Sequence, residues 1–168
     1  MMNDRRVHST ASHAPRGRLV LTVRQRDGRI VAAREVRNIV LRGGAELMAR
    51  RFAGVDGAGP IDRVRVGFGR EVVSVDTTAL TPPADPGVPA SALETALAPS
   101  AFTIATDKPG LVSVTINAVF APTVDLVEVT EAALASAERL YNQVVFEPVH
   151  LQVGQNVTFF WQIDFPFG

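Results

Sequence analysis

The stretch RLYNQVVFEPVHLQVGQNVTFFWQIDFPFG, residues 139–168, contains two apolar runs divided by a proline and a glycine. In the second run, Asn156 to Phe165, alternate residues are apolar: Val157, Phe159, Trp161, Ile163 and Phe165. A period of two is typical of a strand with one buried face. The first run, Leu140 to Glu147, is bounded by Pro148, and Gly154 supplies a turn before the second run. The pattern predicts a terminal β-hairpin that buries an aromatic stripe.

Further strands are predicted along the chain. Arg18 to Gln25 alternates, Asp27-Gly28 supplies the left-handed φ values of a tight turn, and Ile30 to Val36 returns, which predicts a second hairpin. Residues 111–120 alternate cleanly and predict a strand, Pro109-Gly110 before them marks a hairpin with 101–106, and residues 61–67 predict a short strand. Residues 126–134 are compatible with a strand that runs into a turn or with a short Ala-rich helix, and we favour the strand.

One amphipathic helix is predicted in the N-terminal third. Its apolar stripe has helical spacing: Leu41, Ala45, Met48 and Phe52. Asn38 is a candidate N-cap, and Gly54 lies where a left-handed residue would end the helix. Gly43 and Gly44 each cost about 1 kcal/mol relative to alanine in a helix, but they allow the helix to lie close to strands.

These elements predict a mainly β protein, an antiparallel β-sandwich of about seven or eight strands with one α-helix packed on it. Residues 17–168 are expected to form a single domain, since 168 residues suit one hydrophobic core. Residues 1–16 are polar and without a period, which predicts a flexible arm. Residues 81–100 are rich in Pro and Ala and predict a long loop.

The composition excludes several classes of protein. The chain has no cysteine, so disulfides, thiolate metal sites and cysteine nucleophiles are ruled out. No apolar run reaches the roughly 18 residues that span a membrane, and the first residues lack the apolar middle of a signal peptide. We therefore expect a domain without a membrane span or signal peptide, made in the cytoplasm.

The net charge of zero conceals a division between two segments. Residues 1–70 hold fifteen Arg and six Asp or Glu, a net charge of +9, and residues 71–168 carry −9. Strands from the two segments can pair and neutralise each other, which we favour. Alternatively, a subunit with opposed charged ends stacks on its neighbours. A nucleic-acid surface is not expected, because the basic segment has only one aromatic residue, Phe52.

No constellation of residues predicts catalysis. His8, His13 and His150 lack partners at metal-ligand spacing. Gly67-Phe68-Gly69-Arg70 superficially resembles a phosphate-binding loop, but no Lys-Ser/Thr pair follows it. The serines lack the context of a nucleophile elbow. We predict no catalytic, cofactor-binding or metal-ligating residues, no cofactor, and no enzyme activity.

Aromatic residues offer one alternative function. Tyr141, Phe160 or Trp161, if exposed, could stack on sugar rings, as in a carbohydrate-binding module that recognises a cell surface. Against this, Trp161 lies within the apolar stripe and is better placed in the core.

Five segments together carry a resemblance to a known group of proteins: Gly67-Phe68-Gly69, Asp76-Thr77-Thr78-Ala79-Leu80, Val129-Thr130-Glu131-Ala132-Ala133-Leu134, Val144-Val145-Phe146-Glu147-Pro148-Val149 and Trp161-Gln162-Ile163-Asp164-Phe165. In this order, and after a helix that follows an asparagine, they resemble small β-sandwich structural proteins from the tail and baseplate region of tailed bacteriophages and related contractile injection systems. The resemblance covers residues 36–165. This chain departs from the pattern at Phe68, where a small residue is usual, and at Ala133, where a glycine is usual.

The resemblance implies a non-enzymatic component of a virion or injection particle, assembled in the bacterial cytoplasm. Its partners would be other tail or baseplate proteins, and it would form a homo-oligomer. A baseplate, collar or fibre-attachment subunit are all compatible with it.

Overall fold

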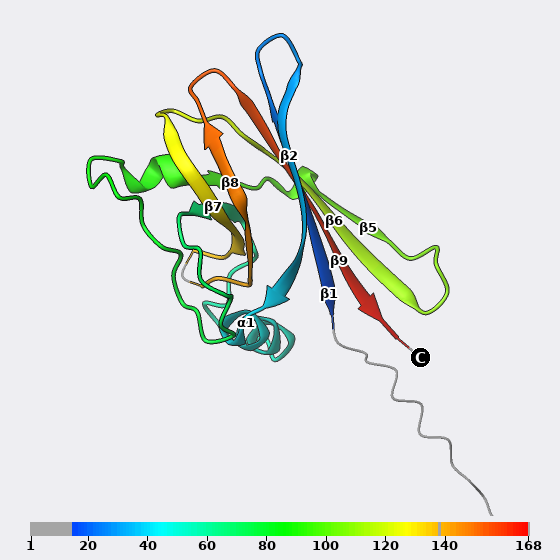
Figure 1. The fold of residues 1–168 in the computed structure, drawn as a ribbon. Coiled ribbons are helices and arrows are strands. Elements are labelled where there is room, and N and C mark those ends of the chain that lie inside the picture. The colour runs from blue at the N-terminus through cyan, green and yellow to red at the C-terminus, as the bar shows by residue number, and fades with distance from the viewer. Residues whose placement is uncertain (1–14, 138, 168) are drawn as a thin grey trace, which may run out of the picture.

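The computed structural model describes residues 15–137 and 139–167. In this part of the chain it contains nine strands and one α-helix, which confirms the predicted mainly β architecture with a helix in the N-terminal third. The strands are β1 (Arg16–Arg24), β2 (Ile30–Val40), β3 (Arg63–Gly67), β4 (Glu94–Ala96), β5 (Phe102–Ala105), β6 (Leu111–Phe120), β7 (Leu126–Ala135), β8 (Asn142–Leu151) and β9 (Asn156–Pro166). The helix α1 (Arg42–Phe52) directly follows β2 (Figure 1).

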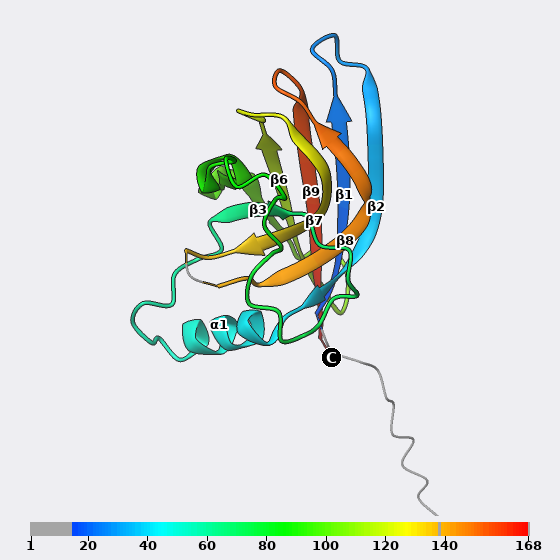
Figure 2. The same cartoon turned by 60° about the vertical axis from the view of Figure 1, so that its left-hand side comes forward.

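The strands form one antiparallel sheet in the order β4-β3-β7-β8-β2-β1-β9-β6-β5. We call β2-β1-β9-β6-β5 the five-strand half and β4-β3-β7-β8 the four-strand half. In the described residues, strand pairing joins them where the end of β2 pairs with β8, Ile39 with Gln143 and Val40 with Asn142. The sheet curls so that the two halves face each other (Figure 2). The predicted sandwich of seven or eight strands is therefore corrected to one curled sheet of nine, because β2 is long enough to pair with both halves.

The predicted terminal hairpin is wrong. Strand β8 lies between β7 and β2, whereas β9 lies between β1 and β6. The short connection that contains Gly154, at φ 88°, crosses from the four-strand half to the five-strand half. Strand β8 also continues through Pro148, at a shift of its register with β7, and such irregularities are where a strand tolerates proline. Alternation identified the buried face of β9 but not its neighbours.

The predicted aromatic stripe is confirmed and forms the centre of the core. Val157, Phe159 and Trp161 are completely buried, and Ile163 is 3% exposed. The rings of Phe159 and Trp161 stack with centroids 5.9 Å apart. Residues of the four-strand half belong to the same cluster, among them Val64, Leu134, Val144 and Phe146. The stripe therefore packs the two halves against each other.

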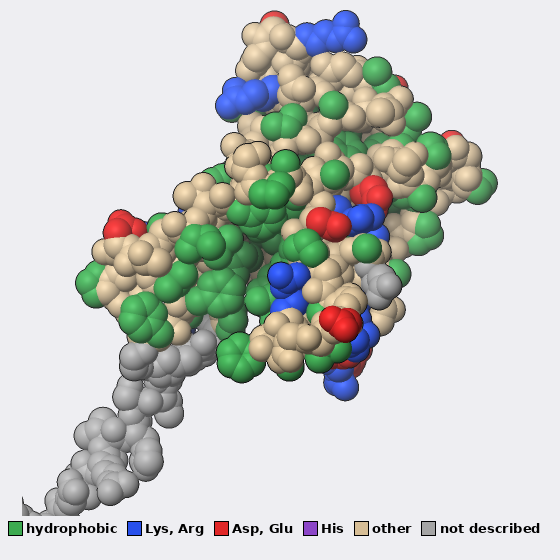
Figure 3. Space-filling model, turned by 180° about the vertical axis from the view of Figure 1, so that it is seen from behind, with side chains coloured by type: hydrophobic (Ala, Val, Ile, Leu, Met, Phe, Trp, Pro, Cys, Tyr) green, Lys and Arg blue, Asp and Glu red, His purple; other side chains and the backbone are tan. Residues whose placement is uncertain are grey.

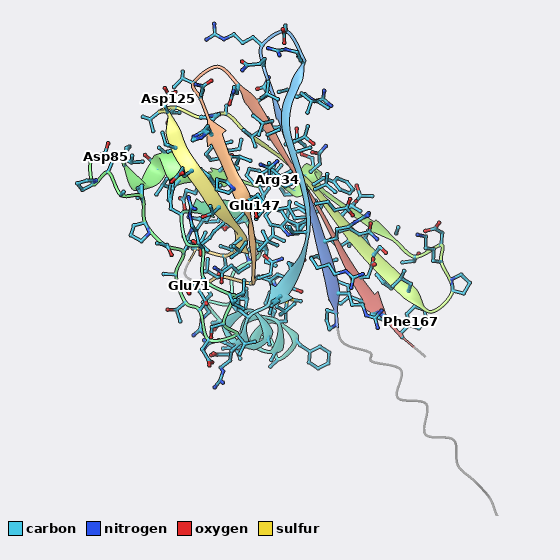
Figure 4. All side chains as sticks on the ribbon, viewed as in Figure 1. Arg34, Glu71, Asp85, Asp125, Glu147 and Phe167 are labelled. Carbon is cyan, nitrogen blue, oxygen red and sulfur yellow. The ribbon has the colours of Figure 1, made fainter. Side chains whose placement is uncertain are left out.

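Arg34 bridges the halves where β2 and β8 are not paired. Its Nε donates a hydrogen bond to the carbonyl of Glu147 at 3.1 Å, and its Nη2 donates to the carbonyl of Pro148 at 2.9 Å. Figure 4 shows Arg34 on β2 beside Glu147 on β8. A side chain thus satisfies carbonyls that have no partner strand at this position.

On the opposite side of the curl, the segment predicted as a long loop contacts the five-strand half. Residues 81–100 contain a 3-10 turn, Ala90–Leu93, followed by β4. A second 3-10 turn, Pro99–Ala101, begins at the end of this segment. Thr95 Oγ1 on β4 donates to the carbonyl of Val119 on β6 at 3.4 Å. Glu94 is paired with Arg63 and Arg65 of β3. These contacts with distant residues order a segment whose own sequence has no periodicity.

The helix was predicted in the right place but with the wrong buried face. It begins at Arg42, Leu41 is the N-cap, and Asn38 lies within β2. Leu41, Gly44 and Leu47 are buried, whereas Met48 is 41% and Phe52 97% exposed. The face is set by Gly44, where a Cβ would collide with the backbone of Tyr141. Gly54, at φ 66°, follows the helix as predicted.

Most of the predicted N-terminal arm, residues 1–16, falls outside the described residues, and Arg16 already belongs to β1.

We predict that Trp161→Ala lowers the free energy of unfolding by about 3 to 5 kcal/mol, the usual cost of deleting a buried aromatic side chain. Urea denaturation measures the change. The matched control is Phe52→Ala, which removes an exposed ring and should change stability by less than about 0.5 kcal/mol. Equal midpoints for Trp161→Ala and the wild type would show that the stripe does not carry the core.

A glycine pair in α1 gives a second prediction. Gly44→Ala should destabilise the protein although alanine favours helices by about 1 kcal/mol over glycine, because the new methyl group overlaps the Tyr141 carbonyl. Gly43→Ala is the control, since its Cβ would lie 3.6 Å from the carbonyl oxygen of Leu140, an ordinary contact. Thermal unfolding should show a lower Tm for Gly44→Ala and an equal or higher Tm for Gly43→Ala. The opposite order would contradict the close helix packing.

Candidate functional site

The structure places one of the three histidines. His8 and His13 lie outside the described residues, and His150 is exposed on β8. Its Nδ1 accepts the backbone N–H of Glu128 at 3.4 Å. Glu128 has a left-handed φ of 60° where the pairing of β7 with β8 is irregular, and its carboxylate pairs with Arg70 Nη2 at 3.0 Å. His150 thus supports a strained bulge. Among residues 15–137 and 139–167, no three His, Asp or Glu are arranged to hold a metal ion.

The aromatic residues considered for sugar stacking do not form an exposed platform. Trp161 is completely buried, and Tyr141 is 3% exposed. Burial also raises the pKa of the Tyr141 phenol above its ordinary value, because the charged phenolate is poorly solvated there. Phe160 is half-buried on the opposite face of β9. Placing Trp161 in the core is therefore confirmed.

A buried carboxylate is the most unusual polar feature of the described chain. Glu131, on β7, is 4% exposed. Its Oε2 accepts the backbone N–H of Thr81 at 2.9 Å, and its Oε1 accepts Gln143 Nε2 at 2.9 Å. Both oxygens thus have donors, as a buried carboxylate requires.

Two glycines make room for this carboxylate. A Cβ at Gly67 or at Gly69 would collide with the carboxylate oxygens of Glu131. The same region is held by Thr130 Oγ1, which donates to the carbonyl of Gly69 at 2.6 Å. We call Glu131, Thr81, Gln143, Gly67 and Gly69 the Glu131 cluster.

The Glu131 cluster fixes an outer layer over the four-strand half. The N–H of Phe68 donates to the carbonyl of Thr81 at 3.0 Å, so both ends of the segment 68–81 meet beside β7. A small apolar cluster lies under this layer: Leu41, Ala133, Ala135 and Leu140, with Val73 and Leu80 packed against it. The arrangement holds residues 68–81 in place. Both carboxylate oxygens of Glu131 already accept hydrogen bonds, so the role of Glu131 is structural.

Glu131 lies within one of the segments that carry the resemblance, but its buried structural role was not predicted from the sequence. The available indication was one acid inside an otherwise apolar strand, VTEAALA. The two departures from the resembled pattern are accommodated: Phe68 packs against the main core, and Ala133 is fully buried in the small cluster. Neither lies in a tight turn, contrary to what the pattern of small residues suggests.

Ion pairs connect the basic and acidic segments within the chain. Arg42 pairs with Asp76 at 2.8 Å and Arg70 with Glu128 at 3.0 Å. Arg63 and Arg65 both pair with Glu94, at 3.2 and 3.0 Å. The pKa of Arg63 is raised, chiefly by its hydrogen bond with Asp62 and further by the charges of Asp62 and Glu94. These contacts support neutralisation inside the subunit over a subunit with opposed charged ends.

The outer face of the five-strand half has a polar hollow of about 610 Å³, lined by Arg16, Arg18, Arg37, Gln162 and Asp164 among others. Arg18 donates to Glu35 at 3.0 Å and to Gln162 at 3.3 Å, and Ser113 donates to Asp164 at 2.7 Å. Hydrogen bonds between side chains therefore connect β2 with β1, β1 with β9, and β9 with β6 on this face, and they stabilise the sheet.

Comparison with known proteins gives no relative: no family model, curated protein or solved structure matches this chain. In the described residues, no helix is both long enough and apolar enough to span a membrane.

Removing the buried carboxylate should loosen the outer layer. We predict that Glu131→Ala costs about 2 to 4 kcal/mol, because it leaves two buried donors, the Thr81 N–H and Gln143 Nε2, without an acceptor. Chemical denaturation gives the cost, and hydrogen exchange should show faster exchange at Thr81. Glu147→Ala, an exposed carboxylate on neighbouring β8, is the control and should have little effect. Unchanged exchange at Thr81 in Glu131→Ala would contradict this role.

Proposed function

We propose that this protein is a structural component of a phage tail or a related contractile injection particle and that it acts through protein–protein contacts. One observation carries the proposal. The segments that resemble tail and baseplate proteins lie far apart in the sequence, but residues of three of them meet at or beside the Glu131 cluster: Gly67 and Gly69, Leu80, Thr130 and Glu131. Segments that carry the resemblance therefore pack together in the fold, although they are far apart in the sequence.

The exposed surface is compatible with this role. Ile104 and Phe167 are large apolar residues that are 68% and 58% exposed. They belong to β5 and to the end of the described residues, and the N–H of Phe167 donates to the carbonyl of Gly110 in the β5–β6 turn. Figure 3 shows hydrophobic side chains gathered on the side where these strands lie. Exposed apolar residues that gather on one side are typical of contact surfaces.

The proposal predicts that the protein is part of assembled particles. Tail-like particles from the bacterium that carries this gene would be purified on a density gradient and their subunits quantified by mass spectrometry. We expect the chain at a fixed ratio to the tube and sheath subunits through repeated purification. An abundant cytoplasmic protein of similar size is the control and should be depleted at each step. Particles that assemble fully while the chain stays in the soluble fraction would contradict the proposal.

A further inference from the structure

The curled sheet has two edge strands, and they differ in how they are covered. Strand β4 has only three residues. Its Glu94 is engaged by Arg63 and Arg65, and its Thr95 bonds to β6. Short length, charge and a covering strand are the usual means by which proteins prevent an edge from pairing with another chain.

The part of β2 that is not paired with β8 has similar protection. Arg34 on this stretch is committed to carbonyls of β8. Glu35 and Arg37 add charge to the same strand, and its pairing with β1 shifts between Val23 and Arg24. A charged and irregular strand is a poor template for another strand.

Strand β5 is also short, but it has neither the charge nor the covering contacts of β4 and β2. Its four residues, Phe102–Ala105, carry no charge and no proline, and they pair with Ser113–Ile116 of β6 without a register shift. Figure 1 shows β5 at the outer border of the five-strand half. In an antiparallel pair the backbone groups of alternate residues point away from the partner, so β5 presents free N–H and C=O groups. Ile104 beside them is 68% exposed.

We propose that β5 pairs in antiparallel fashion with β5 of a second copy of this chain, so that two curled sheets join into one across a twofold axis. Such a dimer would form whether or not the protein belongs to a particle.

Two properties of the strand favour a second copy over another partner. An antiparallel pair of identical strands satisfies twofold symmetry, the commonest symmetry of soluble homo-oligomers. In such a pair the residue beside the axis faces its own copy, so a charge there would face a like charge and weaken the pairing. The uncharged sequence Phe-Thr-Ile-Ala avoids this penalty, and with the axis placed beside Ile104 the two exposed Ile104 side chains meet across it.

Four paired residues form a small contact, below the roughly 1,000 Å² of a stable interface. The dimer should therefore depend on protein concentration. Sedimentation velocity over a concentration series measures its Kd. Ile104→Lys should weaken it by about tenfold or more, since the two lysines would face each other across the axis. Val31→Lys, the same change of chemistry at a residue of β2 that is 42% exposed, should leave the Kd unchanged.

Cysteine cross-linking gives a readout that does not depend on the lysine variant. Because the chain has no cysteine, single variants Thr103→Cys and Ile104→Cys can form only intermolecular disulfides. A disulfide needs Cα atoms about 4.4 to 6.8 Å apart. With the axis beside residue 104, oxidised Ile104→Cys should cross-link at least about tenfold faster than Thr103→Cys, and faster by the same margin than Val72→Cys, whose parent residue is 92% exposed and distant in sequence from β5.

Three results would overturn the proposal: a wild type that is monomeric at every concentration, a dimer whose Kd is insensitive to Ile104→Lys, and cross-linking no faster than that of Val72→Cys. A dimer that is lost on deletion of residues 1–14 but survives Ile104→Lys would show that another segment makes the contact. A β5 dimer that is absent from purified particles would contradict the proposed function alone.

Discussion

The aromatic face of β9 holds the two halves of the curled sheet together. Strand β9 lies in the middle of the five-strand half, so its backbone is paired on both sides, and its inward face meets the four-strand half. Backbone pairing between the halves is limited to two residue pairs, too few to fix the curl. The apolar surface buried around Phe159 and Trp161 supplies the main attraction between the halves, since burial is the dominant favourable term in folding.

Other features of the fold depend on this packing. Once the halves face each other, the connections near Gly154 and Asp125 must cross from one half to the other, and they lie side by side, since Asp125 accepts the N–H of Val153 at 2.8 Å. Arg34 then reaches β8 on one side of the curl, and Thr95 reaches β6 on the other. On the outer face of β7, the Glu131 cluster holds a further layer of chain, so the four-strand half is covered on both faces.

Alternation and turn residues in the sequence predicted those features of the fold that neighbouring residues determine. The β1–β2 and β5–β6 hairpins were predicted because Gly28 and Gly110 mark tight turns at positive φ, and the buried face of β9 follows from its alternation. The strand order could not be predicted, because the turn at Gly154 suits both a hairpin and a crossing between halves. Likewise, the face of α1 depends on the Gly44–Tyr141 contact, and the order of residues 81–100 depends on Arg63 and Arg65. The role of Glu131 depends on Thr81 and Gln143, which only the fold brings to it.

Native-state hydrogen exchange tests most directly whether packing of β9 couples the two halves. If it does, the slowest amides of β9 and those of β7 exchange through the same global opening, with equal free energies and equal dependence on denaturant. We predict this equality, with lower values confined to the outer layer at residues 68–81. A four-strand half whose β7 amides exchange at a distinctly lower free energy than those of β9 would show that it unfolds independently, and would contradict the account.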